Sequence, residues 1–192
     1  MNNQNFEKAL AQTLKNEGVF NGKTGYVNSK NDSGGETNYG ITKAKARECG
    51  YQGKMCDLPY ETAKKIYYNE FWKKTNAANM PNFNLSFFLF DFAVNSGVAN
   101  AAKKLQTAIN KVSGSQLIVD GIIGKKTIST IEEYTKQERG YYHFFVNKIE
   151  KTYIAEILKY YTSLKNANTG FSKNGAGWIN RVANNINFLM GV

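Results

Sequence analysis

The chain has 192 residues, a length that suits one domain or one domain with a small lobe. Its hydrophobic fraction of 42%, with 12 Tyr and 12 Phe, is enough for a packed core, which excludes an intrinsically disordered chain. The formal net charge of +10 suits an anionic partner such as nucleic acid, an anionic membrane or an anionic cell wall. Because Lys and Arg are scattered along the chain, a nucleic-acid partner is disfavoured.

The N-terminal segment has neither a basic start nor an apolar stretch, so it does not predict a signal peptide. The longest apolar run, residues 87–94, is interrupted by Asp91 and is shorter than the roughly 18 residues that a membrane span requires. We therefore expect a protein that is synthesised in the cytoplasm without a signal peptide and that has no stable insertion in a membrane.

Cys49 and Cys56 are the only cysteines, and His143 is the only histidine. The cysteines flank a short stretch with two glycines, which leaves open either a small-loop disulfide or two reduced thiols. A single histidine disfavours the common zinc sites, which need two or more histidines with carboxylates or thiolates. It also disfavours a cysteine–histidine hydrolase, because His143 lies in an aromatic helical stretch. We expect no metal and no cofactor.

The first helix is predicted over residues 3–17. Its apolar stripe runs through Phe6 and Leu10 and then through Thr13 or Leu14. The next step of that stripe is Glu17, whose carboxyl group should therefore face the protein body, and Gly18 is predicted to end the helix. The negative end of the helix dipole and partial burial both disfavour the ionised carboxylate, so both are expected to raise the pKa of Glu17. A raised pKa is what a general acid near neutral pH requires. The alternative is an ordinary glutamate that reaches solvent at a helix end.

A glycine-rich stretch over residues 17–42 follows this helix and holds two further acids, Asp32 and Glu36. Its aromatic and β-branched residues predict an ordered β-ribbon or loop, with residues 32–35 as the turn. A polar run over residues 37–39 follows that turn.

The rest of the chain predicts a mainly α fold. Helices are expected over residues 42–49, 60–73, 85–96, 98–111, 125–136, 138–165 and 177–189, with Thr42 as the cap of the first and Asn84 as the cap of the third. Trp72 is predicted to lie in the core, with a place lining a sugar cleft as the alternative. Asp91 lies in the most apolar helix and must have a partner, which favours a role in holding the fold over catalysis. Asp120 and Gly121 predict a turn in which the carboxylate accepts backbone N–H groups.

Four stretches carry a resemblance to a known family. They are residues 17–20 with 32–42, residues 91–97, residues 120–124 with Thr127, and residues 177–181. Together they resemble the signature of glycoside hydrolase family 108, lysozyme-like N-acetylmuramidases found as phage endolysins and bacterial proteins, some labelled secretion activators. Val19 is a departure, because the usual motif has a second glycine there.

This resemblance implies a lysozyme-like helical domain with a small β-ribbon or loop that carries the active site. It implies that residues 1–97 form the catalytic region. Residues 98–192 would form a helical region similar to peptidoglycan-binding domains, packed with the first as one compact unit.

The resemblance further implies cleavage of the bond between N-acetylmuramic acid and N-acetylglucosamine in peptidoglycan glycan strands, with Glu17 as the general acid. Asp32 is the first candidate for the second carboxylate; its rival, Glu36, is more simply a solvated turn residue. Thr37 is expected to hold a water or a sugar hydroxyl. The expected substrate contacts are Phe20, Asn38, Tyr39 and Asn95.

Other readings of the same sequence remain open. A lytic transglycosylase would use one glutamate as acid and then as base. A non-catalytic cell-wall-binding or secretion-helper protein would bind peptidoglycan without cutting it, and a basic nucleic-acid binder is the third reading. Because no signal peptide is predicted, a holin or a secretion apparatus would have to deliver an enzyme that acts on the cell wall in the periplasm or outside the cell.

Overall fold

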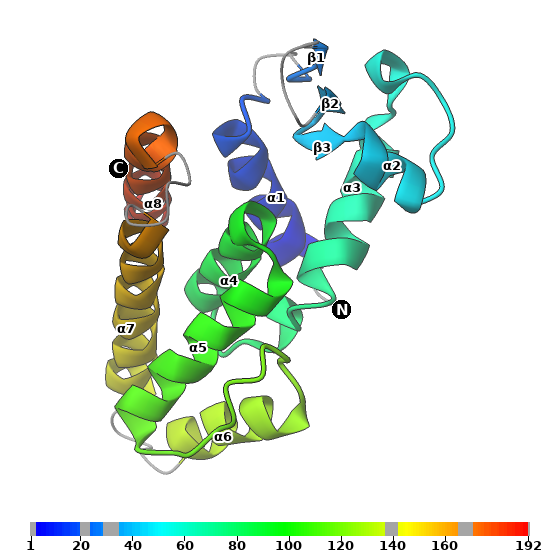
Figure 1. The fold of residues 1–192 in the computed structure, drawn as a ribbon. Helices are drawn as coiled ribbons and strands as arrows, with labels where there is room; N and C mark the ends of the chain where they lie inside the picture. Colours follow the sequence, from blue (N-terminus) through cyan, green and yellow to red (C-terminus); the bar gives the residue numbers. More distant parts are fainter. Residues whose placement is uncertain (1–2, 20–23, 29–34, 137–141, 165–170, 192) are drawn as a thin grey trace. The chain divides into compact units, whose positions relative to one another are not determined.

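The computed structural model describes residues 3–19, 24–28, 35–136, 142–164 and 171–191 (Figure 1). It is mainly helical with one small antiparallel sheet, as predicted, and this is consistent with a lysozyme-like fold. The chain divides into two compact units, Met1–Trp72 and Lys73–Val192. The sequence had suggested a boundary after residue 97. The two boundaries differ because the apolar helix that ends at residue 96 packs with the second unit.

The first unit begins with α1 (Asn3–Asn16), whose buried face carries the predicted stripe of Phe6, Leu10 and Leu14. The helix ends where predicted, because Gly18 has a positive φ of 77°. The N–H groups of Gly18 and Val19 donate to the carbonyls of Lys15 and Leu14, at 3.0 and 2.8 Å. This is a Schellman ending, and it makes Glu17 the last residue before the chain turns away.

A three-stranded antiparallel sheet follows, made of β1 (Val27–Asn28), β2 (Glu36–Asn38) and β3 (Ile41–Thr42). The ends of β2 and β3 pair Asn38 with Ile41, so only Tyr39 and Gly40 connect the two strands. Both residues have positive φ, 52° and 71°. A two-residue hairpin loop with two positive φ angles is the type I′ turn that matches strand twist. The turn predicted at residues 32–35 lies mostly outside the described residues.

Three short helices complete the first unit: α2 (Lys43–Glu48), η1 (Met55–Asp57) and α3 (Tyr60–Tyr67), the last continued by a π-helical turn, η2 (Tyr68–Trp72). Thr42 caps α2 as predicted, because its hydroxyl accepts a hydrogen bond from the N–H of Lys45. Trp72 is 3% exposed and packs against Phe6, with ring centroids 5.5 Å apart, so its predicted place in the core is confirmed.

The second unit holds η3 (Ala77–Asn79), α4 (Phe83–Ser96), α5 (Val98–Ser113), α6 (Lys125–Lys136), α7 (Tyr142–Ser163) and α8 (Phe171–Met190). Helix α4 is buried along most of its length, and α5 and α7 pack against it and against each other (Figure 1). The cap of α4 is Asn82, whose side chain accepts a hydrogen bond from the N–H of Leu85. The predicted cap, Asn84, was therefore wrong, and the helix begins two residues earlier than predicted.

Asp91 on α4 has the partner that its burial requires. The guanidinium of Arg181 on α8 donates two hydrogen bonds to its carboxylate, at 2.9 and 2.8 Å, and Asn185 donates a third at 2.6 Å. All three side chains are at least nine-tenths buried. The prediction that Asp91 holds the fold is supported, with Arg181 as its charged partner.

The predicted turn at Asp120 is also present. Its carboxylate accepts hydrogen bonds from the N–H of Ile122 and the amide of Gln106, and these bonds lower its pKa. The same glutamine accepts from the N–H of Gly121, which has a φ of 85°.

None of the helices, as far as the structure describes them, is long and apolar enough to cross a membrane.

Candidate functional site

The candidate site is built around Glu17, at the end of α1. Its side chain is half-buried, and the Tyr39–Gly40 turn lies directly against it. A Cβ atom built on Gly40 would lie only 3.0 Å from Cγ of Glu17 and 3.1 Å from its Cβ. The hairpin therefore reaches Glu17 only because residue 40 has no side chain.

Tyr67 on α3 also lies against the Tyr39–Gly40 turn. Its hydroxyl donates a 2.8 Å hydrogen bond to the carbonyl oxygen of Tyr39, and it would lie 2.9 Å from a Cβ on Gly40. Tyr67 itself is only 2% exposed. We call the group of Glu17, Tyr39, Gly40 and Tyr67 the glutamate site. The sequence alone gave no sign that Tyr67 lies beside Glu17.

The two polar residues before the turn have different surroundings. Thr37 is half-buried in β2, where it pairs with Val27 and Thr42. Asn38 is fully buried, and its amide donates a 2.6 Å hydrogen bond to the carbonyl of Met55. In this position Asn38 anchors the hairpin to η1, and its side chain has no surface that the expected sugar could contact.

Aromatic rings border the turn. Tyr39 is half-buried, and its ring meets that of Tyr60 edge-on at 5.9 Å. Tyr60 is 41% exposed, and its partial burial raises the pKa of its phenol. Sequence analysis named Tyr39 as a sugar contact but used Tyr60 only as the start of a helix. An exposed tyrosine at a helix start carries no sequence signal that would single it out.

Glu36, the rival second carboxylate, is committed to other contacts. Its carboxylate binds Lys43 at 3.1 Å and accepts a 2.9 Å hydrogen bond from the hydroxyl of Tyr26. These two bonds lower its pKa, so it is ionised and poorly suited to donate a proton. Glu36 is therefore a strand residue that connects β2 to the segment before β1 and to α2. The sequence had predicted a solvated turn residue at this position.

Three predicted site residues remain: Phe20, Asp32 and Asn95. Phe20 and Asp32 lie outside the described residues, as does the side chain of His143. Asn95 belongs to the second unit, in the last turn of α4, and its side-chain oxygen accepts a 2.7 Å hydrogen bond from the hydroxyl of Tyr161.

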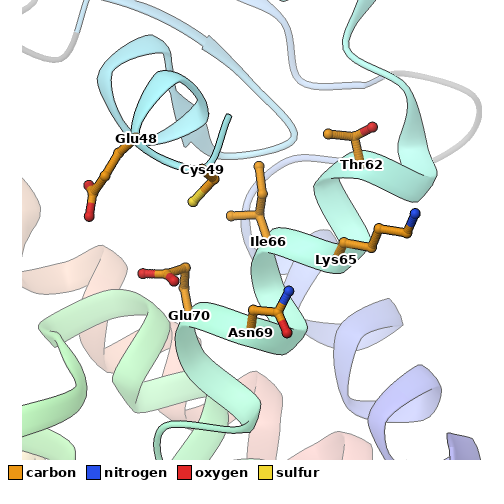
Figure 2. A pocket seen from close by; sticks show the side chains of 7 residues that line it. All are labelled: Glu48, Cys49, Thr62, Lys65, Ile66, Asn69 and Glu70. Carbon is orange, nitrogen blue, oxygen red and sulfur yellow. The ribbon is translucent and has the colours of Figure 1, made fainter. Parts of the chain in front are cut away.

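A separate pocket of about 330 Å³ lies between α2 and α3 in the first unit (Figure 2). It contains none of the residues of the glutamate site, so we identify that site by its contacts and chemistry. Cys49 lines this pocket, and neither it nor Cys56 forms a disulfide.

Comparisons with a family model and with solved structures both give matches. Residues 10–97 match the family model of glycosyl hydrolase 108. The solved structure of Brucella abortus SagA is similar to this chain at a TM-score of 0.65 and 29% sequence identity, covering 94% of this chain and 90% of that one. No curated protein matches the chain. The family resemblance drawn from the sequence is thereby confirmed, while the peptidoglycan-binding character of residues 98–192 stays a prediction.

Proposed function

We propose that this chain, which fits the glycosyl hydrolase 108 family through residues 10–97, is a peptidoglycan hydrolase that cleaves the bond between N-acetylmuramic acid and N-acetylglucosamine. The observation that carries the proposal is the position of Glu17. A carboxylic acid at the end of a helix is held under a glycine turn, and a buried tyrosine fixes that turn. The matched region includes all of these residues.

Glu17 acts as the general acid in this proposal. Glycosidic cleavage requires a proton on the leaving oxygen and stabilisation of an oxocarbenium-like transition state. Packing against Gly40 restricts the side chain, so that the acid is held in one place during the reaction.

Two further groups have roles in the proposed mechanism. Asp32 is the second carboxylate, acting either as nucleophile or as the base for a water. A separation of about 5 Å between the two carboxyl groups would give retention, and about 6.5–9.5 Å would give inversion. Thr37 positions a water or a sugar hydroxyl, and the rings of Tyr39 and Tyr60 offer apolar faces for the sugars beside the glutamate site.

The test is clearing of a purified peptidoglycan suspension by the Glu17→Gln variant. General acid catalysis contributes about 10²–10⁴-fold, so we expect a loss of activity of at least roughly 10²-fold with the fold retained. Glu61→Gln, an exposed change of the same kind on α3, should clear the suspension like the wild type. Full activity of Glu17→Gln would refute the assignment.

A binding function is the second candidate, and one observation favours it. The likeness to Brucella abortus SagA covers 94% of the chain, whereas the hydrolase family covers residues 10–97. The hydrolase match leaves residues 98–192 without an assigned role. A non-catalytic wall-binding or secretion-helper protein would sediment with peptidoglycan but release no fragments, with Glu17 present or absent.

A further inference from the structure

The loop between α5 and α6 exposes a cluster of aliphatic side chains (Figure 1). Ile118 is 75% exposed, Ile122 67% and Val119 41%. Of the seven large hydrophobic side chains that are exposed in the described part of the chain, these three lie within five residues. Single exposed hydrophobic residues are ordinary, whereas a contiguous cluster indicates a surface that binds something apolar. We call Ile118, Val119 and Ile122 the aliphatic cluster.

Hydrogen bonds to α5 hold this loop in one position, so the exposure is part of the fold. The side-chain amide of Asn110 donates to the carbonyl of Leu117 and accepts from its N–H, at 2.8 Å each. The buried amide of Gln106 donates to the carbonyl of Ile122 at 3.0 Å. With both ends fixed in this way, Leu117 and Ile123 are buried while the aliphatic cluster faces solvent.

A small hollow lies in the same surface. It has a volume of about 140 Å³, and the residues that line it include Ile118, Ile122 and Lys126. This volume is below the roughly 300–1,000 Å³ of sites that enclose a small molecule. The hollow therefore suits a partner that lies against the surface.

The residues around the aliphatic cluster are basic. Lys125 and Lys126 begin α6 directly after the loop, and Cε of Lys103 would lie 3.3 Å from a Cβ on Gly121. Asp120 is the only acid of the loop, and α5 carries none. Three ammonium groups against one carboxylate give a formal net charge of +2, and within the described part of the chain none of these lysine side chains has an ion pair. The surface therefore favours an anionic partner that also has an apolar part.

The first turn of α6 strengthens this preference. The free N–H groups at the start of a helix already carry positive partial charge, so two lysines there are placed unfavourably. The turn contains no acid, and Gly124 before it has no side chain that could cap the N–H groups. An anion at this end of the helix would offset both positive contributions.

We propose that this surface docks reversibly on a membrane of anionic phospholipids. The aliphatic cluster enters the boundary between headgroups and acyl chains, and the three lysines lie at the level of the lipid phosphates. A protein partner is disfavoured, because three apolar side chains are far fewer than the about 20–30 residues that each side of a standard interface contributes. A second copy of the chain would bring the same positive charge and be repelled. Docking of this kind needs no membrane-spanning helix and does not depend on the proposed hydrolase activity.

Sedimentation of the full chain with phospholipid vesicles tests this proposal. The vesicles are pure phosphatidylcholine or an equal mixture of phosphatidylcholine and phosphatidylglycerol, and purified peptidoglycan is the third probe. We expect binding to the anionic vesicles and roughly tenfold or weaker binding to the neutral ones. Ile118→Asn/Ile122→Asn should lower the affinity for anionic vesicles by about tenfold or more, because apolar burial is lost. Lys125→Gln/Lys126→Gln should lower it about fivefold per lysine.

Two matched variants serve as controls. Met190→Asn removes a hydrophobic side chain that is 71% exposed elsewhere in the second unit. Lys54→Gln/Lys65→Gln removes two exposed lysines in the first unit and makes the same change in net charge. Both should bind anionic vesicles like the wild type.

Three results would overturn the proposal. They are no binding of the wild type to anionic vesicles, equal binding to neutral and anionic vesicles, and undiminished binding by either double variant of the cluster and its lysines. If the two isoleucines matter for sedimentation with peptidoglycan and not with vesicles, the surface binds the wall and the lipid assignment is wrong. The vesicles contain no peptidoglycan, so a failed lipid test leaves the proposed hydrolase untouched, and loss of hydrolase activity leaves the lipid test unchanged.

Discussion

A single methyl group at residue 40 should disrupt the candidate site. The backbone of Gly40 has a φ of 71°, and a Cβ would lie 3.0 Å from Cγ of Glu17 and 2.9 Å from the hydroxyl of Tyr67. We expect Gly40→Ala to destabilise the protein by about 1–3 kcal/mol and to reduce peptidoglycan clearing, because the turn must move away from the glutamate. Chemical denaturation and clearing assays measure the two effects.

Gly50→Ala is the matched control for this change. Gly50 also has a positive φ, 91°, but a Cβ there would meet no atom within 4 Å. It should therefore cost stability through backbone strain alone and leave clearing unchanged. If both variants keep wild-type activity at a temperature where they are folded, close packing of the turn on Glu17 is not needed for function.

Some of the site could be predicted at the scale of residues, and the rest could not. The stripe of α1 and the glycine after it locate Glu17 at a helix end from local periodicity alone. The contacts with Gly40 and Tyr67 join residues far apart in the sequence, and no local pattern encodes them. The burial of Asn38 was missed for the same reason, because its partner is the carbonyl of Met55.

At the scale of elements, the ion pair between Asp91 and Arg181 connects α4 to α8. Removing one partner of a buried pair leaves an uncompensated charge, so we expect Arg181→Met to lower the free energy of unfolding by about 3–5 kcal/mol. The Asp91→Leu/Arg181→Met double variant should recover part of that loss. Glu48→Gln, which breaks an exposed pair with Lys45, should cost less than about 1 kcal/mol. A similar small loss for Arg181→Met in denaturant unfolding would contradict the assigned role.

Packing of α7 also predicts how stability depends on alkaline pH. Burial raises the pKa of Tyr161 to about 12, above the ordinary value of about 10. The folded state thus prefers the neutral phenol of Tyr161. The contribution of this preference to the free energy of unfolding is complete below pH 10 and is lost as the pH rises through 12. The free energy of unfolding should fall more steeply between pH 10 and 12 in the wild type than in Tyr161→Phe. Equal slopes would show that this phenol does not titrate with unfolding.

Sequence patterns predicted some of the helices and turns and missed others. Helix positions followed from hydrophobic periodicity, since α4 and α5 were predicted to within a few residues. The start of α4 was misplaced because two asparagines, Asn82 and Asn84, stand where either could cap. The Tyr39–Gly40 turn was missed as a hairpin loop because tyrosine rarely takes a positive φ.

At the scale of the whole molecule, charge is unevenly distributed between the two units. Residues 73–192 hold 15 of the 25 basic and 7 of the 15 acidic residues, which gives them +8 of the formal +10. If the second unit binds an anionic wall, sedimentation of the chain with purified peptidoglycan should weaken as salt is raised from about 0.05 to 0.5 M, because salt screens these charges. Binding that does not depend on salt would argue against an electrostatic contribution.

The division into units also shows a limit of sequence reasoning at this scale. Sequence motifs placed α4 with the N-terminal region, and the family match likewise extends to residue 97. Compact units follow packing, and α4 packs with α5 and α7. A boundary drawn from motifs and a boundary drawn from contacts therefore need not coincide.

The central claim is that Glu17 supplies the proton for glycosidic cleavage. Mass spectrometry of fragments released from purified peptidoglycan by the wild type and by Glu17→Gln, side by side, tests it most directly. Fragments that end in reducing N-acetylmuramic acid are expected from the wild type, and almost none from the variant. Anhydro ends would mean a lytic transglycosylase, and the same fragments released by Glu17→Gln at the wild-type rate would contradict the claim.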